Sequence, residues 1–323
     1  MPAEDRKRVM DLCAFLLNIV SSTGIIMVNK RLMSPPPVGC DFKYATTLCG
    51  LHYLFTMGVA SAIEWWNKPT EREQKAAEQD SEGEKKGLGV PLLKIVVFVI
   101  IADMSIIGMN MSLMLNTVGF YQVSKLAMIP ATALFELVFQ KKEFSARVLL
   151  CIFTVLAGVG IATVTDVQFS WGGAMAALIG LLTTAGQQVM INQLQKQYNI
   201  TASALMAQTS PMQAATMLLL GPWVDEVLTG GSKVWEYEYH IPATTMLMVS
   251  CAFAGLVNIS QYMCIGRFTA VTFQVLGHVK TVLVLTLGFL LFDAVITAKN
   301  ILGIVIAVGG MVAYGNATLK KPT

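Results

Sequence analysis

Residues 269–292 read TAVTFQVLGHVKTVLVLTLGFLLF, an almost wholly apolar stretch with Lys280 at its centre. A second stretch, residues 119–139, reads GFYQVSKLAMIPATALFELVF and contains Lys125. Each is long enough to cross a bilayer core of about 30 Å as a helix. An ammonium at the centre of a membrane helix costs roughly 2.5–3.5 kcal/mol, and is usually retained where it faces a watery cavity and binds a ligand. Two such cations, with few intramembrane acids to pair with them, indicate an anionic ligand.

The composition is that of an all-α integral membrane protein. Of the 323 residues, 54% are hydrophobic and 13% charged, and the mean hydropathy is +0.60. Soluble proteins carry about 25% charged residues, and no segment has the period-2 pattern of a β-barrel. The net charge of +3 is small and the basic residues flank apolar segments, so nucleic-acid binding is not expected. The six cysteines lack metal-ligand spacing and no nucleophile motif is assembled, so we expect no metal, no cofactor and no enzymatic activity.

Ten apolar segments predict ten transmembrane helices. They lie at residues 10–33, 42–64, 91–115, 118–140, 146–165, 172–193, 202–228, 243–265, 270–292 and 298–317. Residues 67–89 are charged and lack large apolar side chains, which predicts a disordered cytosolic linker. Residues 1–9 and 318–323 are predicted to be a cytosolic arm and a cytosolic tail.

Lysine and arginine are distributed unevenly over the connections between these segments. With both termini in the cytosol, most of the 23 Lys and Arg residues fall on the cytosolic side. The five on the opposite side are Lys30, Arg31, Lys43, Lys233 and Lys299. Because cytosolic connections of membrane proteins are enriched in Lys and Arg, this bias predicts that both termini are cytosolic.

The chain also repeats itself. Lys125 follows FYQVS and Lys280 follows FQVLGHV, while residues 145–147 (SAR) resemble residues 297–299 (TAK). We therefore predict two five-helix repeats, residues 10–165 and 166–317. An odd number of helices in each repeat inverts the second repeat in the membrane. Inverted repeats around a central polar site are typical of transporters.

Polar residues accompany the two lysines within the segments. At 1.5 Å per residue, Lys280 lies about 15 Å and Lys125 about 20 Å from the cytosolic ends of their helices, so both are near mid-depth. The other intramembrane candidates are Asn110, Tyr121, Gln122, Asn258, Tyr262, Gln274 and His278. Such residues also serve simply as contacts between helices. Asp103 is a candidate proton carrier, whereas Glu136, about one turn from a helix end, is expected at the interface.

Four stretches carry a family resemblance: GFYQVSKLAMIP (119–130), GVGIATVTD (158–166), NISQYMCIGRF (258–268) and VLGHVKTVLVLTLGFLLF (275–292). In these the chain resembles plant-type nucleotide-sugar transporters of the triose-phosphate-translocator clade, within the drug/metabolite transporter superfamily. Lys280-Thr281 resembles the Lys-Thr pair of the subgroup that carries UDP-galactose, UDP-rhamnose or UDP-xylose. Plastid phosphate translocators have Lys-Arg there.

The resemblance implies a strict exchange of a cytosolic UDP-sugar for luminal UMP. It assigns Lys280, Lys125 and Thr281 to the phosphates. The base and sugar would contact Asn110, Tyr121, Gln122, Asn258, Tyr262, Gln274, Gly277 and His278. Asn29 and Lys30 match an Asn-Lys pair at the luminal end of the first helix, where they would gate or attract the ligand.

The C-terminal KKPT places Lys320 and Lys321 as in a dilysine retrieval signal read by coat proteins, or as an ordinary basic flank. The expected location is the Golgi membrane, with cycling through the endoplasmic reticulum; a homodimer is compatible with the sequence. One alternative is a UDP-xylose or UDP-arabinose transporter. Others are a plastid-type sugar-phosphate/phosphate exchanger, a proton-coupled metabolite exporter and a non-transporting scaffold or receptor.

Overall fold

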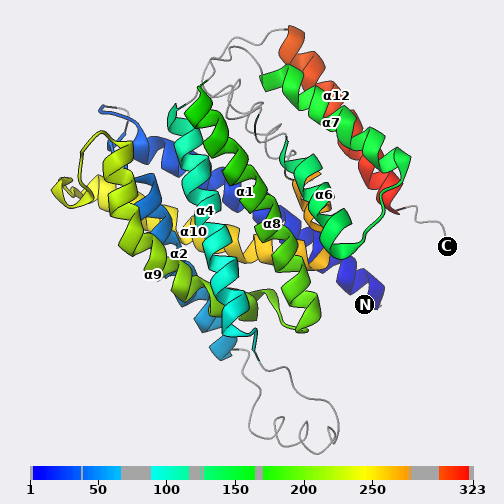
Figure 1. Ribbon diagram of the computed structural model, residues 1–323, viewed down its shortest axis with the longest axis horizontal. Helices are drawn as coiled ribbons and strands as arrows, with labels where there is room; N and C mark the ends of the chain where they lie inside the picture. The colour runs from blue at the N-terminus through cyan, green and yellow to red at the C-terminus, as the bar shows by residue number, and fades with distance from the viewer. Residues whose placement is uncertain are drawn as a thin grey trace, which may run out of the picture. The chain divides into compact units, whose positions relative to one another are not determined.

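The computed structural model describes residues 3–37, 39–66, 89–115, 124, 127–163, 170–275, 277 and 298–319. Its regular structure within these ranges is helical, with one 3-10 turn, η1 (Val234–Glu236). The long helices are α1 (Ala3–Met33), α2 (Ala45–Trp66), α4 (Leu92–Leu115), α6 (Met128–Gln140), α7 (Ala146–Thr163), α8 (Trp171–Gln197), α9 (Ala202–Leu228), α10 (Ile241–Arg267) and α12 (Ala298–Leu319) (Figure 1). A further short helix occupies 270–275.

The helices follow the predicted segments to within a few residues at most ends. At the start of the chain, α1 begins at Ala3 and includes most of the predicted arm 1–9. Its first turns contain Arg6, Lys7 and Arg8, which are good helix formers and allow the helix to continue beyond the apolar stretch. α6 begins at Met128, whereas residues 118–123 and 125–126 of its predicted segment lie outside the described residues. Residues 67–88 of the predicted linker, and residues 278–292 of the segment that contains Lys280, lie outside the described residues.

Five of the described helices are long and apolar enough to cross a membrane. They comprise Arg8–Met33, Ala45–Trp66, Leu92–Ser112, Trp171–Gln197 and Ile241–Arg267. α9 is equally long, but its Gln, Thr, Ser and Pro residues make it less apolar. The protein is therefore an all-helical, multi-pass membrane protein. The number of ten spans and their orientation stay predictions.

The chain divides into two compact units. Unit 1 contains Met1–Asp103 and Met190–Arg267, and unit 2 contains Met104–Val189 and Phe268–Thr323. Two of the three divisions fall inside α4 and α8, so both of these helices contribute to both units, and the third follows the end of α10. Each unit draws on both halves of the chain. The units are thus distinct from the two predicted repeats, which stay a prediction.

In unit 1, α2 packs along α9, and α10 packs against α1 and α2 (Figure 1). Asp225, only 1% exposed near the end of α9, joins the first pair. Its two carboxylate oxygens accept hydrogen bonds from the backbone N–H groups of Thr46 (2.9 Å) and Thr47 (2.7 Å). These N–H groups have no partner within their own helix, since they lie in its first turn. A side chain 178 residues away in sequence therefore caps α2.

The connections that flank these helices form an aromatic cluster in unit 1. Phe42 is fully buried, and its ring lies edge-on to Tyr44 and Tyr237 at centroid distances of 5.3 and 5.1 Å. The Tyr44 hydroxyl donates to the Lys233 carbonyl (2.9 Å), and the Tyr237 hydroxyl donates to the Cys40 carbonyl (2.6 Å). Burial raises the pKa of the Tyr237 phenol, so it stays a hydrogen-bond donor at physiological pH. The α1–α2 and α9–α10 connections are thereby fixed to each other.

In unit 2, α7 and α12 lie side by side and meet at backbone distance (Figure 1). A Cβ placed on Gly158 would lie 2.3 Å from the backbone nitrogen of Ala307 and 2.8 Å from the carbonyl oxygen of Gly303. Only glycine permits this approach, as in many pairs of membrane helices. Gly108 on α4 and Gly180 on α8 make a similar contact. Glycine at positions 108 and 158 thus allows the backbones of neighbouring helices to approach closely.

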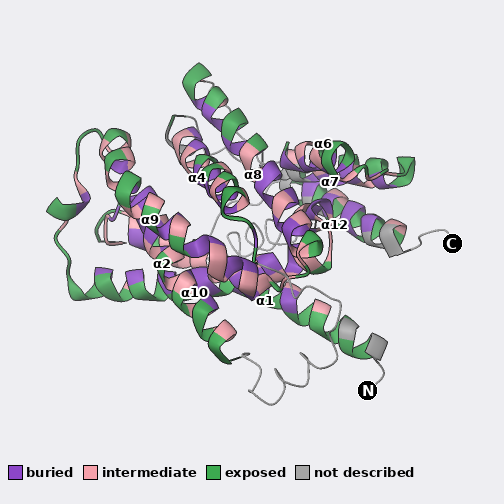
Figure 2. Cartoon of the chain, turned by 60° about the horizontal axis from the view of Figure 1, so that its bottom comes forward, coloured by how far each residue is buried: buried purple, intermediate pink, exposed green. Residues whose placement is uncertain are grey.

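The described helices carry many exposed residues (Figure 2), and many of these are large and apolar. On α7 these include Leu150 and Phe153, and on α12 Val305 and Val312, all more than half exposed. All five tryptophans are also exposed: Trp65, Trp66, Trp171, Trp223 and Trp235. They lie at or near helix ends or in a connection. Apolar faces flanked by terminal tryptophans are typical of helices in contact with lipid.

Candidate functional site

In unit 2, Gln274 of the 270–275 helix pairs with Gln188 of α8. The Gln274 side-chain nitrogen donates to the Gln188 side-chain oxygen at 2.7 Å, and Gln188 is 5% exposed. A Cβ placed on Gly277 would meet no described atom within 4 Å. Asn110 on α4 is half-buried, and its side-chain nitrogen has no hydrogen-bond partner among the described residues. These three predicted residues could therefore offer polar groups or space to a ligand.

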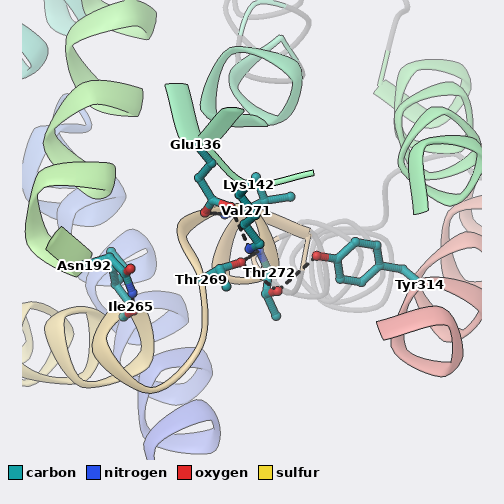
Figure 3. A network of polar contacts seen from close by, with 8 residues as sticks. All are labelled: Glu136, Lys142, Asn192, Ile265, Thr269, Val271, Thr272 and Tyr314. Atoms are coloured by element: carbon teal, nitrogen blue, oxygen red, sulfur yellow. Dashed lines mark hydrogen bonds and ion pairs between the residues drawn. The ribbon is translucent and has the colours of Figure 1, made fainter. Parts of the chain in front are cut away.

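The first turn of the 270–275 helix is held from two sides (Figure 3). Glu136 of α6 accepts from the backbone N–H of Val271 at 3.0 Å and from the Lys142 ammonium at 2.8 Å. On another side, the Thr272 and Tyr314 hydroxyls lie 3.0 Å apart. Glu136 is 0% exposed. The loop after α6 folds back and brings Lys142 against it, so the carboxylate is paired inside the protein. Glu136 lies about one turn from the end of α6, and its position at the membrane interface stays a prediction.

In unit 1, Asn258 and Tyr262 of α10 contact neighbouring helices. The Asn258 side-chain nitrogen donates to the Thr56 hydroxyl at 2.9 Å. Tyr262 is 4% exposed, and its hydroxyl lies 3.4 Å from that of Thr209. Both side chains already have protein partners, so a ligand that bound them would share or displace these contacts.

The end of α10 is tied to α8. The Asn192 side chain donates to the Ile265 carbonyl at 2.6 Å (Figure 3), and the Gln195 side chain donates to the Tyr262 carbonyl at 3.0 Å. The Ile265 carbonyl is among the last four of α10, which lack intrahelical partners, and it is satisfied in this way.

Asn29, the predicted luminal gate, belongs to a buried polar chain that joins three helices of unit 1. The Ser250 hydroxyl of α10 donates to the Asn29 side-chain oxygen at 2.5 Å, and His52 Nε2 of α2 lies 2.8 Å from the same hydroxyl. Lys30 follows Asn29 within α1. Asn29 therefore links α1 to its neighbours.

Asp103, the candidate proton carrier, is buried on α4 at 7% exposure. One carboxylate oxygen accepts from the Thr216 hydroxyl at 2.5 Å, and the other has no hydrogen-bond partner among the described residues. Gln213, one turn before Thr216 on α9, is fully buried, and neither of its amide atoms makes a hydrogen bond of normal geometry within the described chain. Two buried side chains with unused polar atoms thus lie in unit 1.

Eight predicted functional residues lie outside the described residues. They are Tyr121, Gln122, Lys125, His278, Lys280, Thr281, Lys320 and Lys321. Among the described ones, Asn29, Asn258, Tyr262 and Gln274 each make their side-chain contact to a residue that was not predicted.

Several residues that make these contacts were not predicted. Gln187-Gln188 is an adjacent polar pair within an apolar segment, and Asp225 is an acid near the end of one. Both features are visible in the sequence and could have been predicted to make polar contacts. His52 and Ser250, in contrast, are single residues whose pairing depends on how two distant helices pack.

Comparison with known proteins identifies the family. Residues 42–315 match the Triose-phosphate Transporter family. The chain is 43% identical over 312 residues to UDP-rhamnose/UDP-galactose transporter 1 of Arabidopsis thaliana, covering 97% of this chain and 84% of the relative. It is 37% identical over 305 residues to UDP-xylose transporter 1 of the same organism, covering 93% and 82%.

The fold is also found in a solved structure. A crystal structure of another protein superposes on this chain with a TM-score of 0.68, over 94% of this chain and 98% of the other. The sequence identity is 13%, so this likeness shows the fold alone. From the family match and the identities above, the chain belongs to the triose-phosphate transporter family, whose members are transporters and not enzymes.

Proposed function

We propose that this protein is a nucleotide-sugar antiporter of the Golgi membrane, exchanging cytosolic UDP-galactose or UDP-rhamnose for luminal UMP. The observation that carries the proposal is 43% identity, over 97% of the chain, to a transporter named for these two sugars. Two sequence features support it. The Lys280-Thr281 pair resembles that of the UDP-sugar subgroup, and an anionic ligand explains why Lys125 and Lys280 lie within apolar segments. Cycling through the endoplasmic reticulum would use Lys320 and Lys321.

The proposed mechanism is alternating access with Lys280 and Lys125 bound to the phosphates and Thr281 beside them. As the family resemblance implies, the proposed contacts of the base and sugar include Asn110, Asn258, Tyr262, Gln274 and Gly277. With no ligand bound, two cations in a low-dielectric site would be uncompensated. The empty carrier would therefore reorient poorly, and strict exchange would follow from this penalty.

We further propose ten transmembrane helices in two inverted repeats with cytosolic termini. The exposed tryptophans support this topology. Trp65 and Trp66, at the end of α2, would lie at the cytosolic interface. Trp171, Trp223 and Trp235 would lie at the luminal one. Tryptophan is enriched at both membrane interfaces, so two such levels are expected of a protein that spans the bilayer in this way.

The test is exchange in liposomes preloaded with UMP, GMP, CMP or phosphate, against a panel of labelled nucleotide sugars that includes UDP-xylose and UDP-arabinose. We expect uptake of UDP-galactose or UDP-rhamnose that requires internal UMP. Lys280→Ala should reduce this exchange to background, because it removes the charge that offsets the phosphates, while the protein stays in the membrane. Wild-type exchange by Lys280→Ala would refute the assignment of Lys280.

One observation favours proton coupling as a second candidate mechanism: Asp103 is buried, and one of its carboxylate oxygens has no hydrogen-bond partner among the described residues. The same liposomes distinguish the two mechanisms. Uptake that depends on a pH gradient, is insensitive to internal UMP, and is lost in Asp103→Asn would favour proton coupling over nucleotide exchange.

A further inference from the structure

We propose that Glu136 is a positioning residue for transport: its carboxylate fixes the first turn of the helix that carries Gln274. The inference rests on the proposed function, because it takes Gln274 and the residues after it to be the ligand-binding part of the chain. Glu136 itself need not touch the ligand. The geometry that carries the inference lies entirely within unit 2.

Both oxygens of the Glu136 carboxylate accept a hydrogen bond. One oxygen accepts from the Val271 N–H at 3.0 Å and the other from the Lys142 ammonium at 2.8 Å. The side chain is 0% exposed, whereas that of Lys142 is 34% exposed. A charge in such a place is tolerated only when it is paired and hydrogen-bonded. The orientation of the carboxylate is therefore fixed from both ends.

The loop after α6 is shaped to bring Lys142 back. Lys141, the residue directly after α6, adopts a left-handed conformation with φ 51°. Its backbone N–H donates to the Glu136 carbonyl. The Lys142 N–H donates to the same carbonyl at 3.3 Å. The Glu136 carbonyl thus accepts the hydrogen bonds that end α6, while the Glu136 side chain accepts from the first turn of the 270–275 helix.

The helix start that Glu136 holds would otherwise be weakly constrained. The first N–H groups of a helix have no intrahelical partner. Here Thr269 caps the Thr272 N–H at 3.1 Å, and Glu136 supplies the acceptor for Val271. The Val271 and Val275 side chains are fully buried in a cluster with α6, α7 and α12. The first turn is therefore held both by the hydrogen bond from Val271 to the carboxylate and by the apolar contacts of Val271 and Val275.

This placement bears on the ligand residues because they follow directly in sequence. Gln274 is three residues after Val271, and Gly277, Lys280 and Thr281 come within ten. A shift of the first turn would carry Gln274 away from Gln188, its partner at 2.7 Å. It would also alter the starting point from which the following residues reach the ligand. The expected defect is in affinity more than in the amount of folded protein.

The experiment compares Glu136→Gln and Lys142→Gln with the wild type in UMP-loaded liposomes, measuring initial uptake of UDP-galactose against its concentration. The matched control is Lys94→Gln, since Lys94 contacts only the neutral Gln197 and the ring of Tyr198 among described residues. We expect both Glu136→Gln and Lys142→Gln to raise the half-saturation concentration about tenfold, the change expected from one lost charge-assisted hydrogen bond. The control should match the wild type.

A second measurement tests the hydrogen bond between Glu136 and Val271 without measuring transport. Hydrogen–deuterium exchange of the peptide 269–275, with and without UMP, should be faster in Glu136→Gln than in the wild type, and UMP should protect it less. Faster exchange together with unchanged half-saturation would overturn the inference, and so would wild-type hydrogen exchange. If the wild type takes up no UDP-sugar but UMP protects 269–275 in it and not in Glu136→Gln, the proposed substrate fails while the positioning role is supported.

Discussion

Replacing Gly158 by alanine should separate α7 from α12. The added Cβ would lie 2.3 Å from the Ala307 nitrogen, about 1 Å closer than the 3.4 Å at which ordinary contact begins. The obstructing atoms are backbone, so no side-chain rotation relieves the overlap. Overpacking of this kind costs about 1–3 kcal/mol. The helices would have to move apart along a contact that includes the buried Val155 and Ala307.

Gly309 on α12 provides the matched control. A Cβ placed there meets no described atom within 4 Å, so Gly309→Ala adds only the higher helix propensity of alanine, about 1 kcal/mol in favour of folding. We expect the apparent Tm of Gly158→Ala in detergent to fall about 4–8 °C below that of Gly309→Ala. Equal thermal stability of the two variants would refute the close backbone contact between α7 and α12.

Two further substitutions probe helix ends. Asp225→Asn should destabilise the protein by about 1–3 kcal/mol, because the amide can no longer accept from both N–H groups that start α2. Glu226→Gln is its control: the Glu226–Lys233 pair is partly exposed and 3.9 Å apart, so its loss should cost at most about 1 kcal/mol; equal thermal shifts would contradict this. Lys141→Gly should stabilise by roughly 0.5–1 kcal/mol, because glycine adopts φ 51° without strain. Lys141→Ala, which removes the charge but keeps the strain, should show no such gain in a thermal-shift assay, and a gain as large would point to the charge instead.

The positions of the helices could be predicted from the sequence because apolar length is a property of each segment alone. Residues 202–228 were predicted as a segment, and α9 spans Ala202–Leu228. The first helix was predicted too short for the same reason. Hydropathy marks where a helix leaves the apolar region, whereas α1 continues as a helix through charged residues.

The pairing of polar side chains could not be predicted, because it depends on which helices pack together. Gln274 was expected to contact a ligand, yet its partner Gln188 is 86 residues away. The distance of Glu136 from its helix end could be predicted, whereas its contacts with Lys142 and with the Val271 N–H could not. Glycines show the same limit: Gly158 faces a neighbouring backbone and Gly309 faces open space, although both lie in similar apolar surroundings.

The two carboxylate caps have a consequence for how the protein is made. The acceptor for the first N–H groups of α2 is Asp225, and the Val271 N–H has its acceptor in Glu136. Each cap joins residues from opposite halves of the chain. During synthesis, α2 therefore waits for nearly 180 residues before its cap emerges from the ribosome, with water or lipid headgroups as substitutes. Neither half, produced alone, could complete these two helix starts, so assembly of the membrane domain is expected to be late and to require the whole chain.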